Sequence, residues 1–78
     1  MNPMSRLSYE PAFLRHLASA LRREARMIEA LNRNFSRMEK ESGVCFPVEK
    51  STNVARIENL NDAAEVIEAL AAKRIVAT

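Results

Sequence analysis

Residues 11–42 read PAFLRHLASALRREARMIEALNRNFSRMEKES, and this stretch decides the fold. After Pro11 it contains no Gly or Pro, and its apolar residues recur every three, four or seven positions, which is the spacing of one helix face. Pro11 suits the first turn of a helix, where backbone N–H groups lack partners. Gly43, the single Gly of the chain, stands where a residue with positive φ can end a helix. We therefore expect a helix from about residue 9 to 42, with Ser8 as its N-cap.

This predicted helix has two chemically different faces. Its apolar face, placed at 100° per residue, consists of Leu14, Leu17, Leu21, Ala25, Ile28, Leu31, Phe35 and Met38. The opposite face carries a row of Arg residues at spacings of seven, four, seven and four: Arg15, Arg22, Arg26, Arg33 and Arg37. Asn32 and Asn34 are weak helix formers, so a kink or break near residues 32–36 is an alternative to a straight helix.

The chain after Gly43 admits two interpretations. In the first, one helix spans residues 54–74, with an apolar face of Val54, Ile57, Leu60, Ala64, Ile67, Ala71 and Ile75. In the second, residues 54–58 form a strand of a small β element within residues 44–58, and the helix begins near Asn61. Asp62 followed by Glu65 resembles a capping box, which favours that start. Helix over residues 54–58 is slightly favoured.

Both interpretations give a mainly α, single small domain. It has a flexible tail at residues 1–8, the long helix, a loop at 43–53, and a C-terminal region at 54–78. A shorter helix at about 60–74 folds back on the long one as a helical hairpin. A chain of 78 residues buries only about 60% of its unfolded surface, so such a core is marginal. One Cys and one His are too few for a disulfide or a usual structural zinc site, which leaves oligomerisation as the expected support.

A comparison of lengths favours a dimer. The second helix would span about 18–32 Å and the apolar stripe of the first about 50 Å, so part of the stripe would stand in water. Burying one Leu or Phe side chain is worth about 1.5–3 kcal/mol, so we expect a second copy to cover it as an antiparallel helical bundle. The predicted dimer seam is Phe13, Leu14, Leu17, Leu21, Ile28 and Leu31.

Catalysis is not expected from this sequence. With one Gly there is no glycine-rich phosphate loop, so no nucleotide cofactor is predicted. Nucleophilic chemistry would need Cys45 with His16, but the two lie near opposite ends of the helix and no third group orients the His. Cys45 stands between Val44 and Phe46, and we expect it to be buried as a small apolar side chain. No metal site is predicted.

The Arg row is the candidate binding surface. Residues 1–40 carry a net charge of +4 and residues 41–78 a net charge of −2, so the long helix is the basic half of the chain. Arg presents a planar charged fork that suits carboxylates and phosphates. We expect a non-enzymatic protein-binding module, an adaptor, regulator or inhibitor that is homodimeric and meets an acidic protein. The alternative is sequence-nonspecific nucleic-acid binding through the same row.

The expected location follows from what the sequence lacks. No apolar run approaches the roughly 18 residues of a membrane span, so we expect no membrane contact. The Arg-bearing N-terminus resembles a presequence, but the helical pattern continues through it to Ser42. We therefore expect a cytoplasmic protein with a reduced Cys45.

Overall fold

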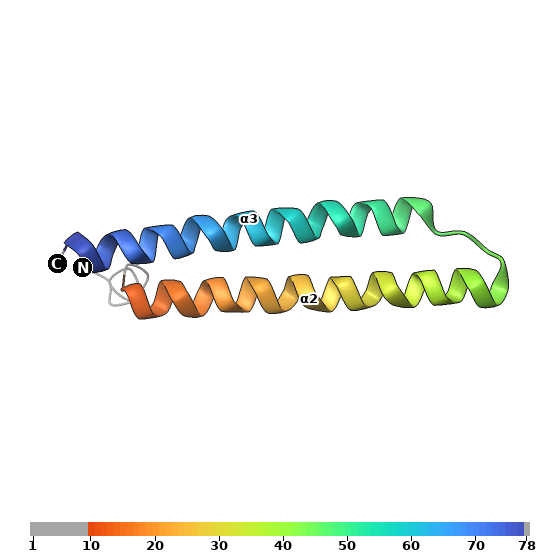
Figure 1. The fold of residues 1–78 in the computed structure, drawn as a ribbon, viewed down its shortest axis with the longest axis horizontal. Helices are drawn as coiled ribbons and strands as arrows, with labels where there is room; N and C mark the ends of the chain where they lie inside the picture. Colours follow the sequence, from red (N-terminus) through yellow and green to blue (C-terminus); the bar gives the residue numbers. More distant parts are fainter. Residues whose placement is uncertain (1–9, 78) are drawn as a thin grey trace, which may run out of the picture.

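Two long antiparallel helices form the fold in a computed structural model that describes residues 10–77 and the side chains of residues 10–73. Helix α2 spans Pro11–Ser42 and helix α3 spans Pro47–Ala77. They lie side by side along their full length, joined at one end by residues 43–46 (Figure 1). We call this end the loop end, and the end where α2 starts and α3 finishes the open end. The predicted helical hairpin is confirmed, and no strand occurs between residues 10 and 77.

The C-terminal end of α2 lies where the sequence predicted it, whereas the helix starts at Pro11 and not at about residue 9, with Glu10 in the N-cap position. Pro11 occupies the first turn, and the N–H of Leu14 donates to the carbonyl oxygen of Glu10 at 3.0 Å. The expected N-cap, Ser8, falls outside the described residues, as does the predicted tail at residues 1–8. At the other end Gly43 has φ 77°, and its N–H donates to the carbonyl oxygen of Glu39 at 2.9 Å. A Gly adopts this left-handed conformation without the steric cost that other residues meet.

Helix α3 begins earlier than predicted. The sequence indicated a loop at 43–53 and a helix at about 60–74, whereas the loop is residues 43–46 and the helix starts at Pro47. Pro47 fits the first turn for the same reason as Pro11. Residues 54–58 are helical, as slightly favoured, and the supposed capping box at Asp62 lies in the middle of the helix.

A carboxylate at the end of α2 explains the early start of α3. Glu39 accepts the backbone N–H of Phe46 at 2.7 Å on one oxygen and the ammonium group of Lys50 at 2.7 Å on the other. The carbonyl oxygen of Phe46 accepts the N–H of Lys50 at 3.1 Å and so opens the first helical turn. The N–H groups at the start of a helix have no acceptor within that helix. Glu39 of α2 supplies an acceptor for one of them, the N–H of Phe46.

The helices pack along one seam with alternating steps of four and three residues. On α2 the seam is Leu14, Ala18, Leu21, Ala25, Ile28, Asn32, Phe35 and Glu39, and on α3 it is Lys50, Asn53, Ile57, Leu60, Ala64, Ile67 and Ala71, all of them buried or half-buried. This spacing is the heptad pattern of a coiled coil. Four of the most buried side chains are Ala, which lets the two backbones approach closely. The core is therefore thin.

Helix α2 continues through residues 32–36 without a break. The alternative of a break there is wrong. Asn32 points its amide across the seam. Its Oδ1 accepts from Nδ2 of the buried Asn53 at 2.8 Å, and its own Nδ2 donates to the carbonyl oxygen of Lys50 at 3.1 Å. The polar side chains thus satisfy each other instead of competing with the helix backbone.

The length comparison behind the expected dimer rested on a wrong premise. Helix α2 has 32 residues and α3 has 31, so they measure about 48 and about 46 Å and cover each other from end to end. Any case for a second copy has to come from side chains that the seam leaves exposed.

Candidate functional site

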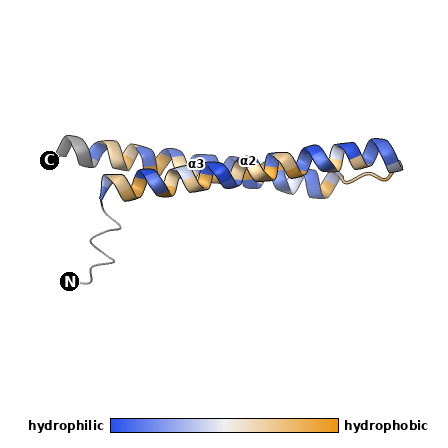
Figure 2. Cartoon of the chain, turned by 90° about the horizontal axis from the view of Figure 1, so that it is seen from below, coloured by the Kyte–Doolittle hydropathy of each residue, from blue (hydrophilic) through white to orange (hydrophobic). Residues whose placement is uncertain are grey.

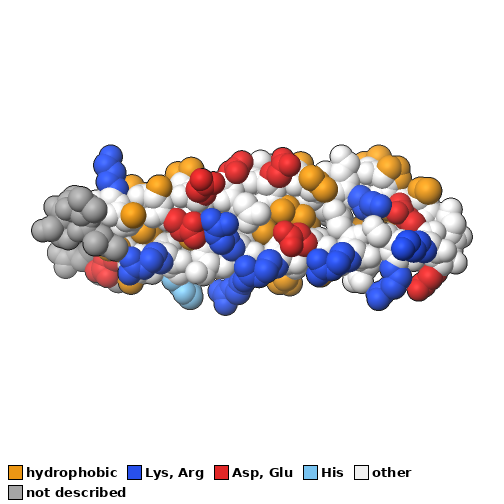
Figure 3. Space-filling view, in the orientation of Figure 1, with side chains coloured by type: hydrophobic (Ala, Val, Ile, Leu, Met, Phe, Trp, Pro, Cys, Tyr) orange, Lys and Arg blue, Asp and Glu red, His pale blue; other side chains and the backbone are white. Residues whose placement is uncertain are grey.

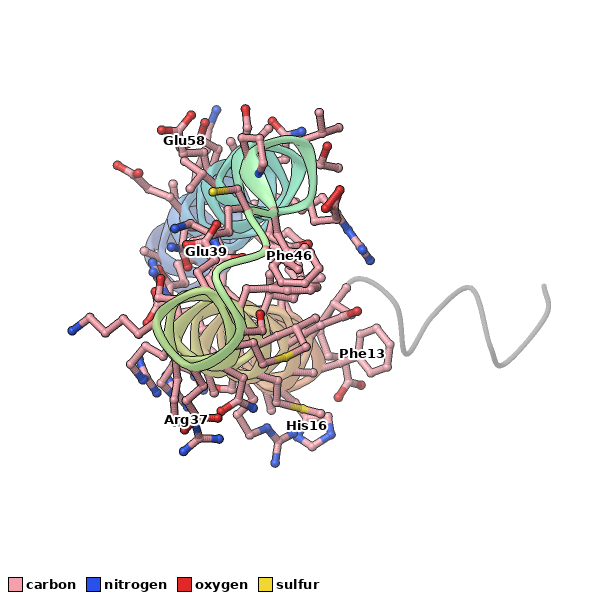
Figure 4. The ribbon with its side chains drawn as sticks, turned by 90° about the vertical axis from the view of Figure 1, so that its right-hand side faces the viewer. Phe13, His16, Arg37, Glu39, Phe46 and Glu58 are labelled. Atoms are coloured by element: carbon pink, nitrogen blue, oxygen red, sulfur yellow. The ribbon has the colours of Figure 1, made fainter. Side chains whose placement is uncertain are left out.

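The two sides of the hairpin that flank the seam differ in chemistry. One side, which we call the basic flank, carries the predicted row Arg15, Arg22, Arg26, Arg33 and Arg37 together with Lys40. Lys and Arg side chains run along α2 on this face and gather toward the loop end (Figure 3). The other side, the apolar flank, carries exposed hydrophobic side chains. Viewed from the loop end, Arg37 and Phe13 project from α2 in different directions (Figure 4).

The basic flank is hollowed at the loop end. This hollow, which we call the basic groove, has a volume of about 520 Å³ and is lined by Asn32, Arg33, Ser36, Arg37, Lys40, Lys50, Ser51 and Val54. Four of these side chains are cations and none is a carboxylate. Glu39, one residue from Lys40, is held by Lys50. Among the side chains that the structure describes, Arg33, Arg37 and Lys40 take part in no ion pair.

One hydrogen bond positions a cation of the basic groove. Nη2 of Arg37 donates to Oδ1 of Asn34 at 2.8 Å, one helical turn earlier. This bond uses one of the five N–H donors of the guanidinium group and leaves the others facing solvent. Arg37 is therefore oriented without being neutralised.

A second, smaller hollow lies nearer the open end of the same flank. It measures about 240 Å³ and is lined by His16, Ser19, Arg22, Arg23 and Arg26. Arg22 is already bound to α3: its Nε and Nη2 donate to the two oxygens of Glu68 at 3.0 and 2.6 Å. This bidentate hydrogen bond lowers the pKa of Glu68 and raises that of Arg22. The five Arg side chains of the row are therefore not equivalent, because Arg22 helps to join the two helices.

The predicted dimer seam divides in the structure. Leu14 and Ile28 are buried and Leu21 is half-buried, all three against α3, so they are part of the intrachain seam. Phe13, Leu17 and Leu31 stay 41%, 38% and 45% exposed. Together with Met27 and Met38 these three make up the apolar flank of α2, to which α3 adds Leu70. Phe13 projects to the side of α2 and not toward α3 (Figure 4).

The candidate nucleophile is placed differently from the prediction. Cys45 is exposed in the loop, not buried, because the neighbouring Phe46 takes the inward position. The ring of Phe46 packs on that of Phe35 with centroids 5.0 Å apart. His16 and Cys45 are separated by nearly the whole length of α2, about 40 Å, so they form no catalytic pair.

The described residues offer neither a metal cluster nor a membrane span. No group of three or more His, Cys, Asp or Glu side chains within residues 10–73 could hold a metal ion. Neither helix, as far as it is described, has a stretch long and apolar enough to cross a membrane. Figure 2 shows why, since hydrophilic residues recur along both helices.

Sequence reasoning found the cations of α2 but missed those contributed by α3. Lys50 and Ser51 were assigned to a loop, so nothing placed them beside Arg33 and Arg37. The signal that could have placed them is the four–three spacing that runs from residue 46 to residue 71. No family model, curated protein or solved structure is significantly similar to this chain.

Proposed function

We propose that this chain is a small, non-enzymatic protein-binding module that pairs with a second copy of itself through the apolar flank. The observation that carries the proposal is the exposure of five large apolar side chains on one side of α2. They are Phe13, Leu17, Met27, Leu31 and Met38, and each is at least 38% exposed. Large apolar side chains gathered in the open on one side of a helix are typical of interaction sites.

The shape of the hairpin supports pairing. Its principal dimensions are 56 × 23 × 15 Å, so each broad side offers more than the about 800 Å² per partner that a standard interface uses. The exposed positions lie next to the seam residues on the helix surface, so a facing hairpin would extend the same core sideways. Two hairpins packed in this way form a four-helix bundle. Its core would be twice as wide as the thin seam of one chain.

The charges on the apolar flank are compatible with a symmetric partner. A hollow of about 250 Å³ on this side is lined by Glu24, Arg56, Asn59 and Leu60. Glu24 and Arg56 have opposite charges, which cancel. A two-fold axis places one such pair from each copy in the interface and therefore adds no net charge there. The basic flank then faces outward from the dimer.

Light scattering on a size-exclusion column tests the pairing. At tens of micromolar we expect about twice the chain mass of 8.8 kDa. Leu17→Glu combined with Leu31→Glu places two charges in the interface and should return the mass to that of one chain. Arg15→Glu combined with Arg26→Glu, on the basic flank of the same helix, is the matched control and should remain a dimer. A monomeric wild-type chain, or equal effects of both pairs, contradicts the proposal.

A second candidate function is sequence-nonspecific nucleic-acid binding, favoured by the basic groove and its lack of carboxylates. Retardation of duplex DNA or RNA should fall steeply with salt, because phosphate contacts release counterions. Arg26→Glu combined with Arg33→Glu should abolish it. No retardation at about 50 mM salt ends this candidate without affecting the pairing.

A further inference from the structure

We propose that the basic groove is a binding site for clustered phosphate groups. Its position is set by both helices: Arg33, Arg37 and Lys40 come from α2, and Lys50 comes from α3. A volume of about 520 Å³ lies within the range of small-ligand sites. The proposal extends the second candidate function, but it holds equally for a free polyphosphate.

The balance of charge in the groove favours an anion. Lys50 is paired with Glu39, whereas no ion pair among the described side chains involves Arg33, Arg37 or Lys40. Three uncompensated cations on one short surface repel one another, and a bound anion relieves that repulsion. The contrast with Arg22 is direct, because that cation of the same row is neutralised by Glu68.

Charge density distinguishes phosphate from carboxylate. Arg33 and Lys40 are seven residues apart, about 10 Å along α2. The phosphates of a condensed polyphosphate share bridging oxygens, so the charges of a triphosphate fall within this length. An extended acidic peptide presents side chains on one face about every 7 Å and would place only one or two carboxylates there. Phosphates therefore match three cations better than carboxylates do.

The neutral lining residues fit the same ligand. Ser36 and Ser51 each bring a hydroxyl group to the groove, one from each helix, and Asn32 adds an amide. Hydroxyl groups donate to phosphate oxygens without adding charge. No aromatic side chain lines the groove, so bases would have nothing to stack on. The geometry therefore assigns contacts to phosphates and none to bases.

The test is titration calorimetry of the full chain with inorganic tripolyphosphate at about 50 mM salt, where screening of charge is weak. We expect saturable binding of one tripolyphosphate per chain. Arg33→Gln combined with Arg37→Gln should weaken it at least tenfold. The matched control, Arg23→Gln combined with Lys73→Gln, removes the same charge from outside the groove and should weaken it less than twofold. Circular dichroism confirms that both variants stay helical.

Two further measurements locate the site and identify its source of phosphate. Amide shifts in NMR spectra should be confined to residues 32–40 and 50–54, which keeps the proposal testable if a variant fails to fold. A ten-nucleotide oligothymidylate that competes with tripolyphosphate indicates a nucleic-acid strand, and one that does not indicates a free polyphosphate; both support the site.

Three outcomes overturn the proposal: no tripolyphosphate binding at the same low salt, equal weakening in the groove and control variants, or tighter binding of an acidic peptide of equal charge than of tripolyphosphate. The last would assign the groove to an acidic protein. Because the site does not depend on the apolar flank, a monomeric chain that binds tripolyphosphate refutes the pairing alone. Failure of oligothymidylate to compete counts against binding of a single strand and leaves the site assigned to a free polyphosphate.

Discussion

Asn32 and Asn53 form a polar layer in a seam that is otherwise apolar apart from the Glu39–Lys50 pair at the loop end. Their amides bond to each other at 2.8 Å, and Asn53 is only 6% exposed. In coiled coils a single buried Asn layer fixes the register and number of helices at some cost in stability. We infer the same role here, because a seam built from so many Ala residues would otherwise allow the helices to slide.

Substitution of this pair by Leu should show strong non-additivity. Asn32→Leu leaves the buried Nδ2 of Asn53 without an acceptor and should lower the free energy of unfolding by about 1–3 kcal/mol. Asn53→Leu should cost less, because Asn32 is partly exposed and keeps its bond to the carbonyl oxygen of Lys50. With both replaced, no buried polar group is left unpaired, and stability should return to the wild-type value or exceed it. Urea denaturation monitored by circular dichroism measures all three.

Two measurements serve as controls for these three variants: the oligomeric mass and the urea dependence of the free energy of unfolding. The double variant should lose register specificity, so light scattering should show a broader range of masses than for the wild-type chain. Simple addition of the two single effects would mean that the Asn pair has no coupled role in the seam.

At the scale of the elements, the loop depends on two residues at the end of α2. Gly43 turns the backbone out of the helix with φ 77°, and Glu39 holds the first turn of α3. A side chain at residue 43 would meet no atom within 4 Å, so any cost of adding one comes from the backbone conformation alone.

Gly43→Ala is therefore a clean test of that conformational cost. The left-handed region costs a residue with a Cβ atom roughly 1–2 kcal/mol relative to Gly. For a chain of this size we expect the melting temperature to fall by about 4–8 °C for each kcal/mol. Gly43→Asn should lose less, since Asn tolerates this region better. A thermal melt in which both substituted chains equal the wild-type chain would show that the turn is not under this constraint.

The two helices were not equally predictable. Pro11 and Gly43 mark the two ends of α2, and both follow local rules that can be applied to the sequence alone. Helix α3 has Pro47 in its first turn and a four–three spacing, but Val48, Val54 and Val66 are exposed on other sides and dilute its apolar face. Its start depends on Glu39, which belongs to the other helix, and that tertiary bond leaves no periodic signal. The groove depends in turn on the register of α3, so its α2 half was predicted and its α3 half was not.

For the whole molecule, two carboxylates join the helices near opposite ends: Glu39 at the loop end and Glu68 toward the open end. Hydrogen bonding to Lys50 and to the N–H of Phe46 lowers the pKa of Glu39, and hydrogen bonding to Arg22 lowers that of Glu68. A lowered pKa in the folded state means that the unfolded chain binds protons more readily there. Both groups therefore contribute stability above the unfolded Glu pKa of about 4.3, and that contribution is lost as the pH falls through the folded pKa values.

The pH dependence of unfolding should therefore come largely from these two sites. We expect the free energy of unfolding to change little through Glu39 and Glu68 between about pH 7 and 5.5, and to decline below about pH 5. Glu39→Gln combined with Glu68→Gln should be less stable than the wild-type chain at neutral pH, and the difference should shrink toward about pH 3. Comparing the two chains removes the general repulsion of a protein that becomes more positive in acid, since both experience it. Glu58→Gln with Asp62→Asn is the matched control, because neither carboxylate forms an ion pair with a described side chain. A difference that stays constant over this whole range would mean that the ionised forms of Glu39 and Glu68 do not hold the hairpin closed.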